Sequence, residues 1–350
     1  MSVIQVNQSG LIWLLVSVLC LMNNSGQASE QGGSRDNRSP AGWQTNRNRA
    51  CFDTSRHIKH RVQVEPGVFV EVLDWGGKGE PLILLSGLGN TAHIYDDFAY
   101  QFTDRFRVLG ITRRGFGDSS KPLEGYDLAT RARDDLKVLD YFKIRKAHFA
   151  GHSIAGTELF YLGSYHADRV KKIVTLDSYD NLANLPPLPD LGELAAVTER
   201  PSDTESPQHY EAAQARWRGF RWPISEDCNS SRFSRKGAFL NSRTPNEVVA
   251  AILTAAGGKA AFNQIKVPAL GFFANPTAEF PAVAWLDPLR QAEWRRMNAA
   301  ARPFSLDVIA RFRTEIPQVE VVEIPHAGHE IFITHEAQVV ERMRAFLLKP

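Results

Sequence analysis

Short, continuously apolar runs recur along this 350-residue chain at intervals that alternate with segments of helical period, such as Leu128–Phe142. The six runs are Leu82–Leu85, Val108–Thr112, Ala147–Ala150, Ile173–Leu176, Leu270–Ala274 and Val319–Ile324, and two more polar strand-like segments, Val62–Glu65 and Val68–Trp75, precede them. A strand that helices cover on both faces loses its polar alternation, so the runs indicate central strands of a parallel sheet. The pattern predicts an α/β fold with a mostly parallel, doubly wound sheet of about eight strands.

The alternation breaks between residues 181 and 264, after the sixth predicted strand. This stretch begins with the proline-rich Leu185–Pro189 and continues with amphipathic, aromatic-rich pieces. We interpret it as a helical cap inserted over the active site, between a first core part at 56–180 and a second at 265–350. Its aromatic residues are expected mainly in the core of the cap, with a lining of an acyl pocket as the alternative; they include Tyr210, Trp217, Phe220, Trp222 and Phe233.

The N-terminus has the pattern of a secretory signal peptide. Leu11–Met22 is an uncharged, mostly apolar run that is too short to span a bilayer comfortably, and the small residues Gly26 and Ala28 follow it. Residues 1–28 are therefore expected to be removed near Ala28, which predicts that the mature protein lies outside the cell or in the periplasm. No Lys or Arg precedes the run, so an uncleaved anchor is the alternative. Residues 29–55 are polar and predict a flexible leader.

Removal of the signal peptide would leave two cysteines, Cys51 and Cys228. In an exported protein two cysteines predict one disulfide, here between the leader and the cap. Two unpaired thiols are the alternative.

The balance of charged residues and the lack of certain motifs limit the kinds of partner and cofactor that we expect. The chain has 41 basic and 39 acidic residues, which does not favour a nucleic-acid partner. It has no His-Glu-x-x-His, Cys-x-x-Cys or Gly-x-Gly-x-x-Gly arrangement. We expect a small-molecule substrate, no metal, no cofactor and no stable membrane insertion.

A serine stands where an apolar run changes into a helix-like segment. Ser153 lies within Gly151–Gly156, and small neighbours there allow the strand and the helix to approach closely. His329 follows it by 176 residues (329 − 153), in a glycine-containing loop after the last predicted strand. Upstream, the strand ending at Leu85 runs into a Gly-rich turn that can aim a backbone N–H at a developing oxyanion.

With the turn Arg114–Ser119, these features make the chain resemble the α/β-hydrolase fold superfamily, in its single-domain branch with a cap, over residues 60 to 350. The resemblance implies that Ser153 is the nucleophile and His329 its general base. It also implies that the backbone N–H groups of Leu88 and Ile154 form the oxyanion hole.

Two positions depart from the usual pattern of that superfamily. In that superfamily the turn that carries the nucleophile, called the nucleophile elbow, usually has glycine two residues after the serine, and here the residue is Ala155. The Gly-rich turn that forms the oxyanion hole usually has histidine before its first glycine, and here the residue is Ser86, which is expected to weaken the local hydrogen-bond network. The neighbouring histidines are expected to have no catalytic part: His152 as a structural residue and His326 as a loop residue.

The acid of the triad has more than one candidate. Thr277 occupies the position where the resemblance leads us to expect aspartate, and threonine cannot stabilise an imidazolium by charge. Asp177, at the end of the sixth strand, is the preferred acid, because some members of the superfamily carry it there. Glu279 and Asp287 are the alternatives, and Asp177 could instead cap the loop that follows it.

The sequence thus predicts a secreted serine hydrolase that cleaves a carboxylic ester through an acyl-enzyme intermediate. An amide, lactone or carbon–carbon bond hydrolase on the same site is one alternative. A catalytically inactive, ligand-binding member of the fold is another. Enzymes that open epoxides or remove halogens are expected to carry aspartate at the elbow, so Ser153 argues against both activities.

Overall fold

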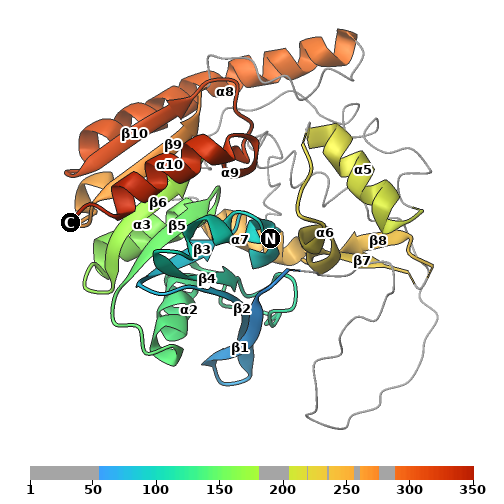
Figure 1. The fold of residues 1–350 in the computed structure, drawn as a ribbon. Helices are drawn as coiled ribbons and strands as arrows, with labels where there is room; N and C mark the ends of the chain where they lie inside the picture. The colour runs from blue at the N-terminus through green and yellow to red at the C-terminus, as the bar shows by residue number, and fades with distance from the viewer. Residues whose placement is uncertain (1–54, 181–204, 219, 235, 256–260, 276–287) are drawn as a thin grey trace, which may run out of the picture.

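The computed structural model describes residues 55–180, 205–218, 220–234, 236–255, 261–275 and 288–350. Eight strands form one sheet in the order β1-β2-β4-β3-β5-β6-β9-β10 (Figure 1). They are β1 (Ile58–Glu65), β2 (Val68–Gly76), β3 (Glu80–Leu85), β4 (Phe106–Thr112), β5 (Ala147–His152), β6 (Val170–Leu176), β9 (Ala269–Ala274) and β10 (Val319–Ile324). β2 pairs antiparallel with β1 and β4, and all other neighbours are parallel. The predicted fold class is confirmed.

The two faces of the sheet bury separate sets of side chains. In β3, Ile83 and Leu85 belong to one hydrophobic cluster, whereas Leu82 and Leu84 belong to another. Both faces are apolar because helices cover both, which explains why the sequence of each central strand shows no polar alternation.

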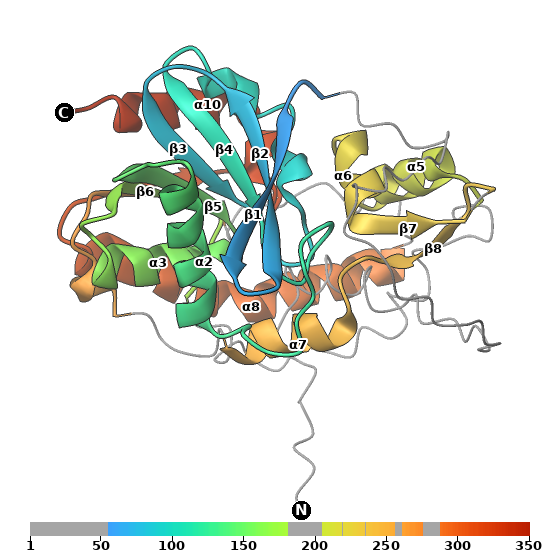
Figure 2. The same ribbon diagram turned by 90° about the horizontal axis from the view of Figure 1, so that it is seen from below.

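Different helices cover the two faces of the sheet. The first face carries α2 (Leu128–Tyr141), α3 (Ala155–Tyr165) and α8 (Pro288–Glu315), which lie together in Figure 2. The opposite face carries the short 3₁₀ helices η1 (Ala92–Tyr95) and η2 (Ala99–Phe102), then α9 (Ile331–Thr334) and α10 (Glu336–Leu347). α2 begins where the Asp127 side chain accepts a 2.9 Å hydrogen bond from the Thr130 amide, which satisfies one of the free N–H groups of the first turn.

The described residues between β6 and β9, where the sequence predicted a helical cap, include strands as well as helices. Its described elements are α5 (Pro207–Arg218), α6 (Ile224–Ser230), β7 (Ser231–Phe233), β8 (Phe239–Ser242), α7 (Asn246–Ala255) and η5 (Phe262–Gln264). β7 and β8 form an antiparallel hairpin, whose turn includes Gly237 at φ 92°, a conformation that favours glycine. The Tyr210 ring stacks on the Phe239 ring with centroids 4.3 Å apart, and this contact joins α5 to the hairpin.

The aromatic residues of the cap divide between two environments. Tyr210 and Phe233 pack with Phe239 inside the cap, as expected of cap core. Trp222 is buried instead with the core cluster of η1, η2, α9 and α10. The side chain of Trp217 lies outside the described parts of the structure.

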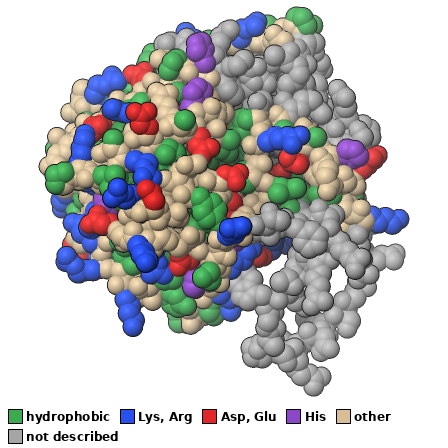
Figure 3. All heavy atoms as spheres, viewed as in Figure 1, with side chains coloured by type: hydrophobic (Ala, Val, Ile, Leu, Met, Phe, Trp, Pro, Cys, Tyr) green, Lys and Arg blue, Asp and Glu red, His purple; other side chains and the backbone are tan. Residues whose placement is uncertain are grey.

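Several expectations concern residues that the structure does not describe. The signal peptide, most of the leader and Cys51 fall in residues 1–54, and Thr277, Glu279 and Asp287 fall in 276–287. Within the described residues, no helix has both the length and the apolar character needed to cross a membrane. On the face of the molecule in Figure 3, basic and acidic side chains are interspersed.

Candidate active site

The carboxyl ends of neighbouring parallel strands gather the chemically active side chains at one edge of the sheet. Ser153 follows β5, Asp177 follows β6, and His329 lies in the loop after β10. β5, β6, β9 and β10 are consecutive in the sheet. Ligands of open α/β sheets bind outside this edge.

Ser153 occupies a sharp turn between β5 and α3. Its φ is 57°, in the left-handed region, and its amide donates to the carbonyl of Leu176 at 3.2 Å. A Cβ on Gly151 would lie 2.8 Å from Ala155 Cβ, and one on Gly156 would lie 2.4 Å from Ser178 Cβ. The strand and the helix therefore approach too closely for larger residues, as a nucleophile elbow requires.

Asp177 and His329 are hydrogen-bonded, with 2.7 Å between Asp177 Oδ2 and His329 Nδ1. The other carboxylate oxygen, Oδ1, accepts from the Ala274 amide at 2.9 Å and from the Tyr179 hydroxyl at 3.2 Å. The Asp177 amide donates to Phe272 O at 2.9 Å, although its φ is 50°. The carboxylate is thus held by the Ala274 amide and the Tyr179 hydroxyl while it faces the imidazole.

The electrostatics of His329 suit a general base. Burial works to lower its pKa, but the hydrogen bond and the negative charge of Asp177 outweigh burial and raise the pKa above its ordinary value of 6.5. A base with a raised pKa accepts a proton from a serine hydroxyl more readily once it is neutral.

His152 precedes Ser153 and contacts two other loops, the loop after β10 and the Gly-rich loop after β3. Its Nε2 lies 3.1 Å from the His329 carbonyl oxygen, and the centroids of the two imidazole rings are 4.4 Å apart. Burial, helped by the charge on His329, lowers the pKa of His152 well below its ordinary value, so it is neutral and donates through Nε2. A Cβ on Gly87 would lie 2.8 Å from His152 Nδ1, which shows how closely the Gly-rich loop packs on this ring. The sequence indicated a structural role but not this bridge.

The Gly-rich loop after β3 is closed by its own hydrogen bonds. The Ser86 hydroxyl donates to the Asn90 carbonyl at 2.8 Å, and the Asn90 amide donates to the Gly87 carbonyl at 3.3 Å. Ser86 therefore contributes a hydrogen bond that holds the turn, where the sequence led us to expect a weaker network. Gly89, at φ 76°, completes the turn.

Leu88 and Ile154 are brought together. Both are buried in one apolar cluster with residues of α7 and of the loops near β4, namely Phe116, Tyr126, Val248, Val249 and Ile252. The two residues whose N–H groups the sequence assigned to the oxyanion hole therefore share one environment, and α7 of the cap supplies its apolar wall.

A buried network of ion pairs supports the Gly-rich loop after β3, and this network was not predicted from the sequence. Arg113 donates through both terminal nitrogens to the Ser86 carbonyl at 3.1 Å and forms a bidentate pair with Glu158 of α3 at 2.8 and 2.7 Å. Arg131 of α2 donates to the same carboxylate at 2.7 Å. Burial would raise the pKa of Glu158, but the two guanidinium charges lower it overall. Such a contact joins residues distant in sequence, so no local pattern reveals it.

One group of side chains among the described residues has donor atoms of the kind that bind metals. Atoms of His57, His93 and Asp96 lie within 4.8 Å of one another. His57 Nδ1 is 2.9 Å from Asp96 Oδ1, His93 Nδ1 is 3.2 Å from Asp96 Oδ2, and the Trp75 indole also donates to Oδ1 at 3.0 Å. Hydrogen bonds thus account for both carboxylate oxygens. That no metal takes part in the chemistry stays a prediction.

The chain is similar in sequence to parts of several proteins named as hydrolases. The RutD protein of Caulobacter segnis, a candidate carbamate hydrolase, is 33% identical over 116 residues, covering 32% of this chain and 43% of that protein. The soluble epoxide hydrolase of Corynebacterium sp. strain C12 is 30% identical over 106 residues, covering 30% and 37%. The matches thus span less than half the length of either relative.

Solved structures resemble the chain over a longer stretch. The crystal structure of the enol-lactonase from Burkholderia xenovorans LB400 superposes with a TM-score of 0.56 and 21% identity, covering 82% of this chain and all of that one. The family described as alpha/beta hydrolase fold matches residues 80–336, well over half of the chain. The protein therefore belongs to the α/β-hydrolase family.

Proposed function

We propose that this protein is an exported serine hydrolase that cleaves a carboxylic ester through an acyl-enzyme intermediate on Ser153. The observation that carries the proposal is the 2.7 Å contact between Asp177 and His329, at the sheet edge where Ser153 also lies. Export is proposed from the N-terminal sequence pattern alone.

In this mechanism neutral His329 takes the hydroxyl proton of Ser153 as the oxygen attacks the ester carbonyl. The backbone N–H groups of Leu88 and Ile154 donate hydrogen bonds to the negatively charged carbonyl oxygen. Asp177 stabilises the imidazolium, which then gives the proton to the leaving alcohol. A water molecule, activated in the same way by His329, releases the carboxylic acid and restores the serine.

The apolar wall contributed by α7 favours an ester with an apolar group on the acyl or alcohol side. A lactone is a cyclic ester and needs the same steps, and the likeness to an enol-lactonase makes lactone hydrolysis the second candidate. An amide substrate would use the same groups. Epoxide opening, the activity named for one relative, is disfavoured because serine, not aspartate, stands at the elbow.

A fluorophosphonate probe followed by peptide mapping tests the nucleophile directly. We expect the label on Ser153, and we expect Ser153→Ala to lose labelling and about 10⁴- to 10⁶-fold in ester turnover while unfolding at an unchanged temperature. More than about a tenth of the wild-type rate in the variant would reject Ser153 as nucleophile. A folded wild-type protein that neither takes the label nor hydrolyses a panel of p-nitrophenyl esters would favour the ligand-binding alternative.

A further inference from the structure

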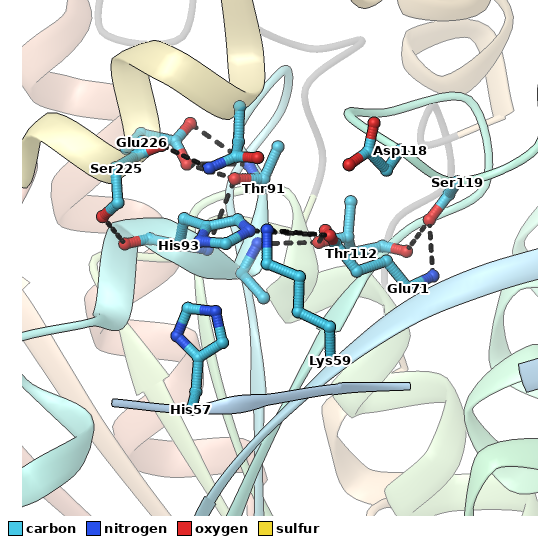
Figure 4. A network of polar contacts seen from close by, with 12 residues as sticks. His57, Lys59, Glu71, Thr91, His93, Thr112, Asp118, Ser119, Ser225 and Glu226 are labelled. Carbon is cyan, nitrogen blue, oxygen red and sulfur yellow. Dashed lines mark hydrogen bonds and ion pairs between the residues drawn. The ribbon is translucent and has the colours of Figure 1, made fainter. Parts of the chain in front are cut away.

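The short cap helix α6 packs on the segment that follows the Gly-rich loop. Figure 4 shows Ser225 and Glu226 projecting from α6 towards His93 and Thr91 of the core. The Ser225 hydroxyl donates to the His93 carbonyl at 3.5 Å. Glu226 is wholly buried at this contact.

The Glu226 carboxylate accepts hydrogen bonds from two adjacent core residues, Asn90 and Thr91. The Thr91 amide lies 3.1 and 3.2 Å from its two oxygens, the Thr91 hydroxyl donates to Oε2 at 2.5 Å, and the Asn90 side-chain amide donates to Oε1 at 3.1 Å. Four hydrogen bonds thus run from one side chain of the cap to two neighbouring residues of the core.

Asn90 and Thr91 are the two residues that end the Gly-rich loop. The Asn90 amide and carbonyl close the turn around Leu88 through Gly87 and Ser86. Thr91 also caps η1, since its hydroxyl accepts from the His93 amide at 3.3 Å. A shift of Asn90 and Thr91 would therefore change the direction of the Leu88 N–H group.

We propose that Glu226 is a positioning residue: it ties the cap to the oxyanion loop, so that the Leu88 N–H is correctly aimed only while α6 is docked. The proposal rests on the proposed function, because it assigns Glu226 a part in the same hydrolytic site. Glu226 itself touches neither the substrate nor the reacting atoms.

The tie should weaken as the solution approaches neutral pH. Burial raises the pKa of Glu226 from its ordinary value of 4.5 to about 7, against the hydrogen bonds from Thr91 and Asn90 and the influence of His93. Burial also raises the pKa of Tyr95 on η1, and the negative charge of Glu226 adds to that rise. An acid whose pKa is raised by docking binds its proton more tightly in the docked state, so docking loses stability as the pH rises from 4.5 to about 7.

Other titratable groups lie close to this carboxyl. On η1 the imidazole of His93 acts to lower the pKa of Glu226, and its Nδ1 lies 3.2 Å from Asp96 Oδ2. On α6 itself the neighbouring acid is Asp227, and on the packed elements α5 and β7, His209 and Arg232 are exposed. Comparison of Glu226→Gln with the wild type therefore isolates the part of the pH response that belongs to Glu226.

The test compares Glu226→Gln and Glu226→Ala with the wild type, and uses Glu247→Gln on the exposed side of α7 as a matched control within the cap. With p-nitrophenyl butyrate, Glu226→Ala should lower kcat by about tenfold or more and change KM by less than about threefold, because an oxyanion donor acts in the transition state. The ratio of wild-type kcat to that of Glu226→Gln should fall as the pH rises from 4.5 to about 7 and should level off above that. An unchanged kcat in Glu226→Ala, or a ratio independent of pH, would overturn the proposal.

Hydrogen exchange separates failure of the tie from failure of the proposed function. The peptide that contains Asn90 and Thr91 should exchange faster in Glu226→Ala, and in the near-isosteric Glu226→Gln if the alanine variant does not fold, but not in Glu247→Gln. Unchanged exchange in Glu226→Ala and Glu226→Gln would reject the tie even in an active enzyme. If the Glu226 variants exchange faster but the wild-type protein hydrolyses no ester, the contact between the cap and the core is supported and the proposed substrate is rejected.

Discussion

At the scale of single residues, unusual backbone conformations concentrate at the active site. Four non-glycine residues in the described parts of the chain have positive φ: Lys143, Ser153, Asp177 and His326. Three of these lie at the carboxyl edge of the sheet, and each costs about 1–2 kcal/mol relative to an ordinary conformation. The surrounding hydrogen bonds hold them there, which fixes the hydroxyl and the carboxylate before any substrate arrives.

Asp177→Asn tests the assignment of the acid. An amide favours the wrong imidazole tautomer and cannot stabilise the imidazolium, so we expect ester turnover to fall by about 10⁴-fold. Steady-state kinetics with a p-nitrophenyl ester measure the loss. Glu279→Gln and Asp287→Asn serve as controls and should each cost less than about tenfold. The reverse pattern would move the acid to the segment after β9.

The pH profile of the enzyme should reflect the environment of His329. Because Asp177 raises the pKa of His329 above 6.5, and only the neutral ring accepts the serine proton, kcat/KM should decline on acidification with a midpoint above 6.5. The protonated ring also stabilises the folded state below that pH, and this contribution is lost as the pH rises through the folded-state pKa. Measurement of kcat/KM between pH 5 and 9 gives this midpoint. A midpoint below 6 would contradict the assignment of His329 as the general base.

At the scale of elements, most of the core could be predicted from local patterns, but contacts between distant segments could not. The continuous apolar runs indicated six strands of the main sheet, two more polar segments indicated β1 and β2, and small residues around Ser153 indicated the turn between β5 and α3. The β7–β8 hairpin was missed, because three- and four-residue strands are too short to show a period. The contact of Glu226 with Thr91 spans 135 residues, and the Arg113–Glu158 pair spans 45, so neither is encoded in local periodicity.

Gly156→Ala tests the close approach of α3 to the loop after β6. The added Cβ would lie 2.4 Å from Ser178 Cβ, so we expect a loss of about 1–3 kcal/mol in the free energy of unfolding and a lower kcat. Gly163→Ala in the same helix is the control. Its Cβ would meet side-chain atoms of Ile265 and Val267 at 3.3 Å, and the gain in helix propensity of about 1 kcal/mol offsets this crowding. Urea denaturation compares the two, and equal losses would contradict the steric argument.

At the scale of the whole molecule, the cap is joined to the core by more than packing. Glu226 links it to the oxyanion loop, and α7 covers Leu88 and Ile154. The disulfide predicted for Cys228, on α6, would add a covalent link. These connections restrict the motion of the cap, and the same part of the molecule is expected to shape the substrate pocket.

The predicted partner of Cys228 is Cys51. Mass spectrometry of unreduced peptides from protein prepared in its native compartment should find the two cysteines in one cross-linked species. Two free, alkylatable thiols there would refute the pairing and would weaken the proposal of export, since such bonds persist in oxidising compartments.

The position of Asp177 after β6 also determines when the enzyme becomes active during its own synthesis. The nucleophile and the acid lie within 25 residues of each other and belong to strands made early, whereas the base that contacts the acid follows 152 residues later. A domain generally folds as a unit, although its N-terminal part emerges first during synthesis. A chain that ends before residue 329 carries the proposed nucleophile and acid but not the proposed base, so we expect it to be inert.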